Sequence, residues 1–184
     1  MQIYNEKIFD LLNPLQLPKQ NSQGLRLRWS PKEQFQVENL FVFECKNASE
    51  AFDYFYYGLK NKIMASHKLN QASSRSHSIL SLRVESTDLM NTENTVVSKI
   101  DLVDLAGSER GAQTGNESGI SQKEGIEINK SLFTLRQVIS TLAEAQKGDK
   151  KEKLHIPYRE SKLTCLLKQS IGGNCFCLMV VPKF

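Results

Sequence analysis

Two short segments carry side chains whose types and spacing suit a magnesium-bound phosphate. In the first, DLVDLAGSE at 101–109, Asp104 ends an apolar run and Gly107 follows three residues later. An acid at the carboxyl end of an apolar strand stands where open α/β sheets bind ligands, and its oxygens suit the hard Mg²⁺ ion. Because glycine has no Cβ, the Gly107 amide could approach a terminal phosphate. The D-x-x-G pattern alone is weak, and an ordinary turn after a strand is the alternative.

The second segment, NQASSRSH at 70–77, lies between an expected helix and an expected strand. The adjacent hydroxyls of Ser73 and Ser74 could coordinate magnesium and bond a terminal phosphate. Arg75 could pair with a carboxylate such as Glu109. A polar loop before a strand is the alternative interpretation, and His77 in isolation is more typical of a structural histidine than of a catalyst.

The elements that would position these segments alternate between strand and helix, which favours an α/β sheet covered by helices. Alternating or Val- and Phe-rich runs predict the strands, and apolar residues at helical spacing predict the helices. The predicted strands are 25–29, 36–43, 78–86 (half-buried), 95–105 and 175–181 (buried), and residues 1–12 are predicted to be a strand end that runs into a short helix. The predicted helices are 48–62, 121–146 and 160–170.

Composition and charge exclude several classes of protein. The 184 residues are 40% hydrophobic and 24% charged, which argues against a disordered or fibrous chain. No apolar run approaches the roughly 18 residues that a membrane span needs, and the first residues lack the layout of a secretory signal. The net charge of +4 is too small to indicate a nucleic-acid binder, but residues 147–168 are rich in lysine and arginine. That basic run is either a solvated face or a surface for an acidic partner.

Taken in order, the segments SSRSH, DLAGSE, INKSL, HIPYRESKLT and GGN resemble the kinesin motor domain over nearly the whole chain. The resemblance implies an α/β fold: a partial three-layer P-loop NTPase motor fold, with a central mixed sheet flanked by helices. It implies one partial motor domain over 1–184, without the N-terminal strands and phosphate loop. Within it, switch I would cover about 70–77, switch II about 104–109, the relay helix about 121–146, and the tubulin-facing loop and helix about 150–170.

The resemblance also implies a function, namely ATP binding and hydrolysis coupled to movement along microtubules, with ATP and Mg²⁺ as cofactors of the complete motor. The implied nucleotide-binding residues are Asn70, Ser73, Ser74, Asp104 and Gly107, with Ser74 and Asp104 at the magnesium, partly through water. The implied catalytic residues are Arg75, Glu109 and Ser74. Arg75 and Glu109 would form a latch between the switches that helps to position the attacking water.

The implied partner is the microtubule. The implied tubulin-facing residues are Lys130, Lys153, His155, Arg159 and Lys162, and the expected location is the cytoplasm and the microtubule cytoskeleton. No nucleic-acid or membrane partner is expected. Dimerisation would depend on neck and stalk segments that this sequence does not include.

The chain departs from the family in one major respect, because it contains no Gly-Lys dipeptide and so no phosphate-binding GxxxxGK[ST] loop. We therefore expect this chain alone to be inactive as an ATPase. Since the strand leading into that loop normally lies between the Asp104 strand and the final strand, we also expect exposed sheet edges and marginal stability. A truncated, non-motor microtubule-binding product is the alternative function. A small GTPase or a myosin is disfavoured, because a guanine-reading NKxD motif is absent.

Overall fold

The computed structural model describes residues 1–13, 15, 23–30, 34–68, 76–88, 90, 94–107, 119–147 and 154–181. Its strands are β1 (Gln2–Tyr4), β2 (Lys7–Phe9), β3 (Leu27–Ser30), β4 (Gln34–Val37), β5 (His77–Thr87) and β6 (Thr95–Asp104). Its helices are α1 (Ala48–Lys68), α2 (Gly119–Lys147), the 3₁₀ helix η3 (Tyr158–Glu160), α3 (Lys162–Leu166) and α4 (Lys168–Gly172). The predicted α/β fold class is confirmed.

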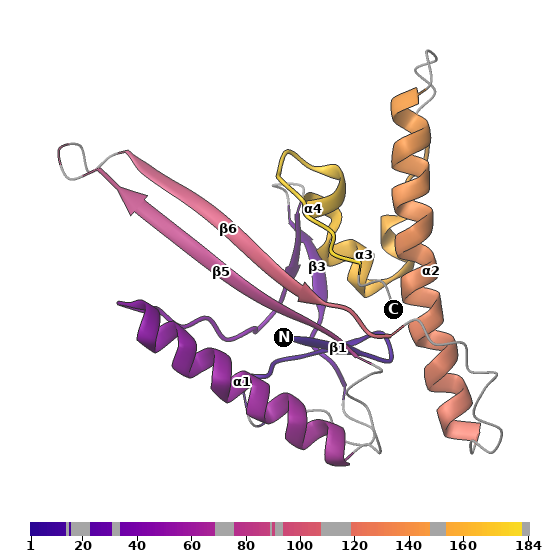
Figure 1. The fold of residues 1–184 in the computed structure, drawn as a ribbon, viewed down its shortest axis with the longest axis horizontal. Coiled ribbons are helices and arrows are strands. Elements are labelled where there is room, and N and C mark those ends of the chain that lie inside the picture. Colours follow the sequence, from indigo (N-terminus) through magenta and orange to yellow (C-terminus); the bar gives the residue numbers. More distant parts are fainter. Residues whose placement is uncertain are drawn as a thin grey trace.

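The main sheet has four described strands in the order β2-β1-β5-β6, and its described pairs are all antiparallel. Strands β5 and β6 pair along nearly their whole length, from Ser78 opposite Asp104 to Thr87 opposite Thr95, and project from the rest of the fold as a long ribbon (Figure 1). Strands β3 and β4 form a separate hairpin, which reaches the main sheet through a bridge between Leu25 and Ile8.

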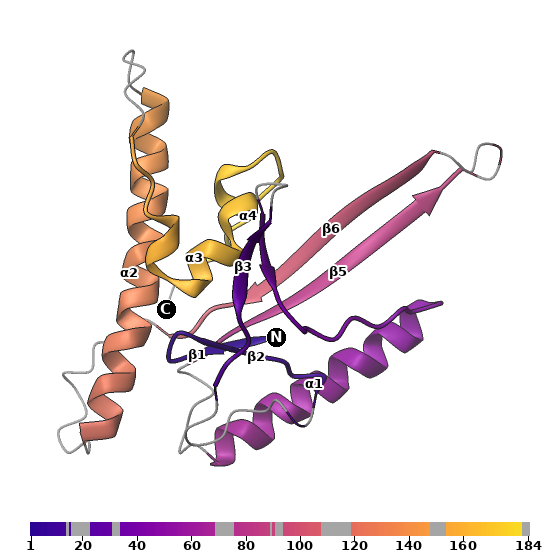
Figure 2. The same cartoon turned by 180° about the vertical axis from the view of Figure 1, so that it is seen from behind.

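Helices α1 and α2 lie on opposite sides of the sheet at the end where β5 begins and β6 ends, as the two opposed views show (Figures 1 and 2), and most side chains of the β5–β6 ribbon remain exposed. Successive side chains of a strand point to opposite faces, so His77 and Ser78 mark the two faces of β5. Ser131 of α2 contacts His77, whereas Lys62 of α1 contacts Ser78. The main hydrophobic core lies on the α2 side and is formed by Ile3, Ile8, Ile79, Leu135, Leu163 and Leu167.

The prediction of a short helix within residues 1–12 is wrong, because these residues form the β1–β2 hairpin. Tyr4 pairs with Lys7, and the two turn residues, Asn5 and Glu6, have φ angles of 48° and 53°. Two left-handed residues make a tight turn whose twist matches that of paired strands. The conformation arises without a glycine, so the usual hairpin signal is missing from the sequence.

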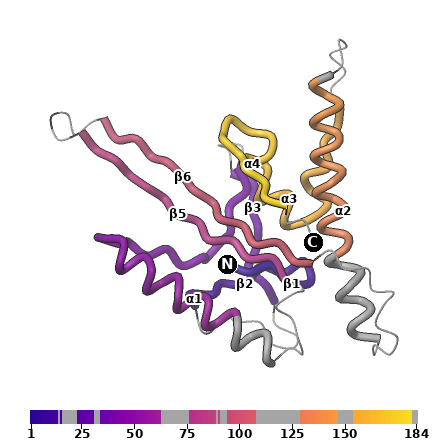
Figure 3. The backbone as a smooth tube through the Cα atoms, viewed as in Figure 1, coloured from indigo at the N-terminus to yellow at the C-terminus, as the bar shows by residue number. Residues whose placement is uncertain are grey.

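Two further boundaries differ from the prediction. The strand expected at 36–43 already ends at Val37. Two residues later Asn39, which has a φ of 56°, turns the chain. The single helix expected at 160–170 is divided into α3 and α4 at Leu167, whose ψ of 1° is not helical. Helix α2 and strands β5 and β6 agree with the prediction to within a few residues in position, and the tube view shows where these elements lie in the fold (Figure 3).

The prediction of a buried strand at 175–181 is also wrong. These residues form no strand in the structure, and the side chains of Phe176, Leu178 and Val180 are almost fully exposed. None of the described strands pairs with this segment, so it lacks the hydrogen-bond ladder and the apolar cover that a buried strand requires. The half-burial expected for 78–86 is confined to the first residues of β5. None of the described helices is long and apolar enough to cross a membrane.

Candidate functional site

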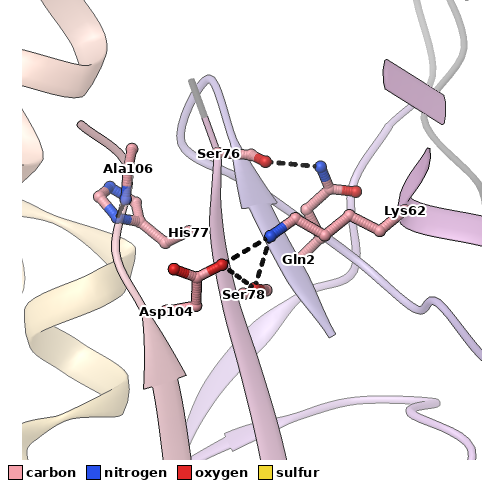
Figure 4. Close-up of polar contacts among 7 residues, drawn as sticks. All are labelled: Gln2, Lys62, Ser76, His77, Ser78, Asp104 and Ala106. Atoms are coloured by element: carbon pink, nitrogen blue, oxygen red, sulfur yellow. Dashed lines mark hydrogen bonds and ion pairs between the residues drawn. The ribbon is translucent and has the colours of Figure 1, made fainter. Parts of the chain in front are cut away.

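The ends of the two candidate segments lie side by side. Strand β5 begins at His77, at the end of the serine-rich segment, and β6 ends at Asp104, in the middle of the D-x-x-G segment. Because Ser78 pairs directly with Asp104, both segments leave the sheet at the same end (Figure 4). The amide of Gln2 donates to the Ser76 hydroxyl at 2.8 Å and holds the end of the first segment against β1.

Asp104 lies in a small polar cluster at this end of the sheet (Figure 4). Its Oδ2 accepts from Lys62 Nζ at 2.9 Å and from the Ser78 hydroxyl at 3.4 Å, while Lys62 also donates to Ser78 at 2.9 Å. The lysine side chain is 13% exposed, but the carboxylate is 74% exposed. A carboxylate this open to solvent can face a hydrated cation while it remains beside the lysine.

His77 is buried and joins three elements. Its Nδ1 accepts from the backbone N–H of Ala106 at 3.0 Å, and its Nε2 lies 2.8 Å from the Ser131 hydroxyl. Since a main-chain N–H can only donate, Nδ1 carries no proton, and the neutral ring donates its Nε2–H to Ser131. Burial lowers the pKa of His77 from 6.5 to about 4; the nearby carboxylate of Asp104 raises this pKa and the Lys62 ammonium lowers it further.

This arrangement makes one neutral imidazole the connection between the start of β5, the chain after β6 and the middle of α2. Ala106 and Ser131 are both buried. If either element moved, its hydrogen bond to the imidazole would break at a place where water cannot replace it. The interpretation of His77 as a structural histidine is therefore correct about its burial, but it missed that the ring links both candidate segments to the long helix.

Lys62 was also missed by the sequence analysis, because a lysine in an amphipathic helix is typical of a solvated residue.

Six of the predicted site residues lie outside the described residues: Asn70, Ser73, Ser74, Arg75, Glu109 and Lys153. Gly107 is described and half-buried.

The donor set at Asp104 fits magnesium better than a tightly chelated metal. Among the described residues no group of three or more His, Cys, Asp or Glu side chains could hold a metal ion. Mg²⁺ usually keeps several waters and takes only one or two carboxylates together with substrate phosphates. The single exposed carboxylate of Asp104 meets that requirement.

The predicted track-facing residues are spread over α2 and the chain that leads into α3. Lys130, His155 and Arg159 are exposed, and Lys162 is half-buried. The backbone N–H of Lys162 donates to the Glu6 carboxylate at 2.7 Å, which fixes the start of α3 to the β1–β2 turn. The Ser161 hydroxyl accepts from Thr164 N at 3.1 Å and caps this helix.

Comparison with known proteins gives one consistent result. The family model of the kinesin motor domain matches residues 1–182. Kinesin-related protein 1 of Dictyostelium discoideum is 43% identical over 183 residues, which are 98% of this chain but 8% of that protein. Human kinesin-like protein KIF9 is 40% identical over 181 residues, which are 98% of this chain and 22% of KIF9.

Solved structures agree with the sequence relatives. The structure of a fast kinesin superposes with a TM-score of 0.75 at 32% identity, covering 92% of this chain and 44% of that one. A structure of KIF14 with ADP in complex with a microtubule superposes with a TM-score of 0.75 at 41% identity, covering 94% of this chain and 48% of that one. The chain thus spans less than half of these solved chains.

Proposed function

This chain belongs to the kinesin motor domain family, and we propose that it is the switch-bearing and track-facing part of a microtubule-based motor that hydrolyses ATP. The observation that supports this most is the junction at His77, where the ends of both switch segments meet the long helix. A phosphate-binding GxxxxGK[ST] loop is absent from these residues. Hydrolysis therefore needs such a loop from another part of the protein, and this chain alone is inactive as an ATPase.

Asp104 would hold Mg²⁺ and the Gly107 amide would bind the terminal phosphate in the nucleotide-bound motor. When bound, the ion neutralises charge that develops on the transferred phosphoryl group. Lys62 keeps the Asp104 carboxylate at the end of β6 by an ion pair of 2.9 Å. By the family resemblance, Ser73 and Ser74 of switch I would sense phosphate and magnesium, and Arg75 with Glu109 would close the two switches over the nucleotide.

The His77 junction carries the state of the switches to the track-binding face. Ala106 follows Asp104 by two residues, so a shift of switch II moves the N–H that bonds to the imidazole. The same ring bonds to Ser131, whose neighbour Lys130 is exposed on α2. A change in switch position would therefore bias the position of α2, because packed interfaces tend to move between discrete arrangements.

The basic face binds the microtubule through Lys130, Lys153, His155, Arg159 and Lys162. KIF14, which is 41% identical, has been solved in complex with a microtubule. A concentration of cations, such as the lysine- and arginine-rich run 147–168, favours an acidic partner and speeds its association. The protein accordingly acts on the microtubule cytoskeleton, in the cytoplasm.

The test uses a protein that carries this chain together with a GxxxxGK[ST] loop. Cosedimentation with microtubules is measured with ATP and with a non-hydrolysable ATP analogue, for the wild type, for Asp104→Ala and for the control Asp53→Ala on the exposed surface of α1. The wild type and D53A should bind more tightly with the analogue than with ATP, and D104A should lose that difference. Nucleotide-independent binding by the wild type would instead support a non-motor microtubule-binding product.

A further inference from the structure

The β1–β2 hairpin connects the end of the serine-rich segment with the start of α3. At one end, Gln2 of β1 pairs with Ser78 of β5, and the Gln2 side chain donates to the Ser76 hydroxyl at 2.8 Å (Figure 4). All three residues of β1 are buried. The end of the serine-rich segment is therefore attached to a short strand that is packed inside the fold.

The turn of the same hairpin holds α3. Glu6 follows Gln2 by four residues, and its carboxylate accepts a hydrogen bond from the backbone N–H of Lys162 at 2.7 Å, a contact that spans 156 residues of sequence. Asn5 and Glu6 form a tight turn with φ angles of 48° and 53°, so the Glu6 backbone moves only together with the two strands. Negative charge is favourable at the start of a helix, and a carboxylate makes the stronger kind of hydrogen bond.

Helix α3 depends on such outside contacts for its position. It has five residues, Lys162–Leu166, and isolated helices shorter than about 12 residues are marginal in water. Leu163 is fully buried in the main core and holds one side of the helix. The Ser161 hydroxyl caps Thr164 N within the same segment, whereas Glu6 attaches the first N–H of the helix to a different part of the fold.

We propose that Glu6 is a positioning residue, which fixes the start of α3 to the β1–β2 hairpin and so transmits a displacement of the serine-rich segment to α3. The link runs in order through Ser76, Gln2, β1, Glu6 and the N–H of Lys162. It is separate from the His77–Ser131 bond and gives α3 a second connection to that segment, in addition to α2. The proposal rests on the proposed function in treating the serine-rich segment as a nucleotide switch and α3 as part of the track-binding face.

Cys165 of α3 reports the release of this helix without nucleotide or microtubules. Its thiol is buried and donates to the Tyr158 carbonyl at 3.2 Å, so a thiol reagent reaches it only when α3 opens. The test uses the full chain with the other three cysteines replaced, as Cys45→Ser, Cys175→Ser and Cys177→Ser. The rate at which Cys165 reacts with a thiol reagent is then measured for each further variant.

Variants of Glu6 test the attachment. Glu6→Ala should raise the labelling rate of Cys165 by about tenfold, because it removes a hydrogen bond to a charged group. Glu6→Gln removes the same charge but keeps an oxygen acceptor, so its increase should be smaller. The matched control Glu44→Ala removes an exposed acid and should leave the rate unchanged. Equal rates for E6A and E6Q would show that charge near the thiol sets the rate and would overturn the proposal, as would equal rates for E6A and E44A.

A double-mutant cycle tests the transmission through the hairpin. Gln2→Leu removes the hydrogen bond to Ser76 and should raise the labelling rate of Cys165 by about threefold. In the Glu6→Ala background the same substitution should add nothing, because the link is already broken at Glu6. No effect of Q2L alone, or the full threefold effect in the E6A background, would overturn the proposal. The far-ultraviolet circular dichroism of each variant establishes that it is folded.

A kinetic measurement tests the same residue in a protein that also carries a GxxxxGK[ST] loop. Glu6→Ala should raise the microtubule concentration that gives half-maximal ATPase stimulation by about tenfold and should leave the rate without microtubules unchanged. An unchanged half-maximal concentration, together with a raised labelling rate of Cys165, would overturn the role of Glu6 in positioning α3 for the track.

The outcomes distinguish this inference from the proposed function. If the labelling rates show the link but the protein with the loop hydrolyses no ATP, the link through the hairpin stands and the motor assignment fails. If microtubules stimulate the ATPase normally and neither E6A nor Q2L changes the labelling of Cys165, the link fails and the motor assignment stands.

Discussion

Acidification should destabilise this chain through His77. The ring is 3% exposed, and its pKa in the folded chain is about 4 against the ordinary value of 6.5. Below pH 6.5 the unfolded chain binds a proton that the folded chain excludes. The stability that His77 contributes is therefore complete above 6.5, is lost as the pH falls from 6.5, and changes no further below about 4.

The size of the effect follows from the difference in pKa. The shift from 6.5 to about 4 corresponds to a total loss of roughly 3 kcal/mol in the free energy of unfolding. By about pH 5.5 roughly 1 kcal/mol of this is already lost. The window between about pH 8 and pH 5.5 is the most informative, because it lies above the ordinary range in which carboxylates titrate.

Urea unfolding followed by Trp29 emission measures this free energy at both pH values. The variant His77→Asn removes the titrating ring and should lose less stability than the wild type between the two pH values. A smaller loss should remain, because burial also lowers the pKa of the Met1 amino group from 8.0. At about pH 8 the same variant should be destabilised by about 2 kcal/mol, because the buried hydrogen bond between the imidazole and Ser131 is lost. The control His155→Asn alters an exposed ring whose solvent contact changes little on unfolding, so it should keep the wild-type pH dependence.

The reasoning would be refuted if the wild type and H77N lost equal stability between about pH 8 and pH 5.5. A second observation is independent of unfolding. The histidine ¹⁵N signals of the folded chain at neutral pH should show His77 as the Nε2–H tautomer. A proton on Nδ1 instead would be incompatible with the Ala106 N–H as its donor.

Three further perturbations test the packing of the chain. Asn61→Ala should cost about 1–3 kcal/mol in urea unfolding, because the buried Nδ2 donates to the Leu11 carbonyl at 2.7 Å and that acceptor would be left without it. Ser161→Ala should cost about 1 kcal/mol in the same assay, since it removes the N-cap of α3; Ser161→Asp, which can also accept a cap bond, should recover most of the loss. Strand β6 is an edge strand of the described sheet, and Val96→Lys places a charge on it at a side chain that is 65% exposed. Light scattering on heating should fall, while the midpoint of unfolding stays the same. Unchanged scattering would mean that this edge does not mediate association.

Local patterns predicted the long elements because their signals are local. The apolar repeat that includes Leu135 placed α2, alternation placed β5, and a strongly apolar run around one acid placed β6. The β1–β2 hairpin was not predicted, since its turn depends on left-handed Asn5 and Glu6 rather than on glycine. The 175–181 segment has the composition of a buried strand, but burial depends on a partner strand, and composition cannot supply one.

The candidate site, too, could be predicted from the sequence only in part. Asp104 was selected because a carboxylate at the end of an apolar strand is a local pattern, and the structure places it opposite Ser78, next to the end of the serine-rich segment. Lys62 and Ser131 become part of the site only through contacts that span 42 and 54 residues of sequence. A periodic pattern or a short motif gives no information about contacts between residues so far apart in the sequence. The resemblance to a family therefore identified the segments but not the hydrogen bonds that join them.

The central claim is that the His77–Ser131 bond couples the nucleotide switches to the track-binding helix. The direct measurement compares basal and microtubule-stimulated ATPase rates of Ser131→Ala with those of the control Ser140→Ala, an exposed serine on α2, in a protein that also carries a GxxxxGK[ST] loop. S131A should keep its basal rate and lose most of its stimulation by microtubules, while S140A keeps both. Full stimulation of S131A would contradict the claim.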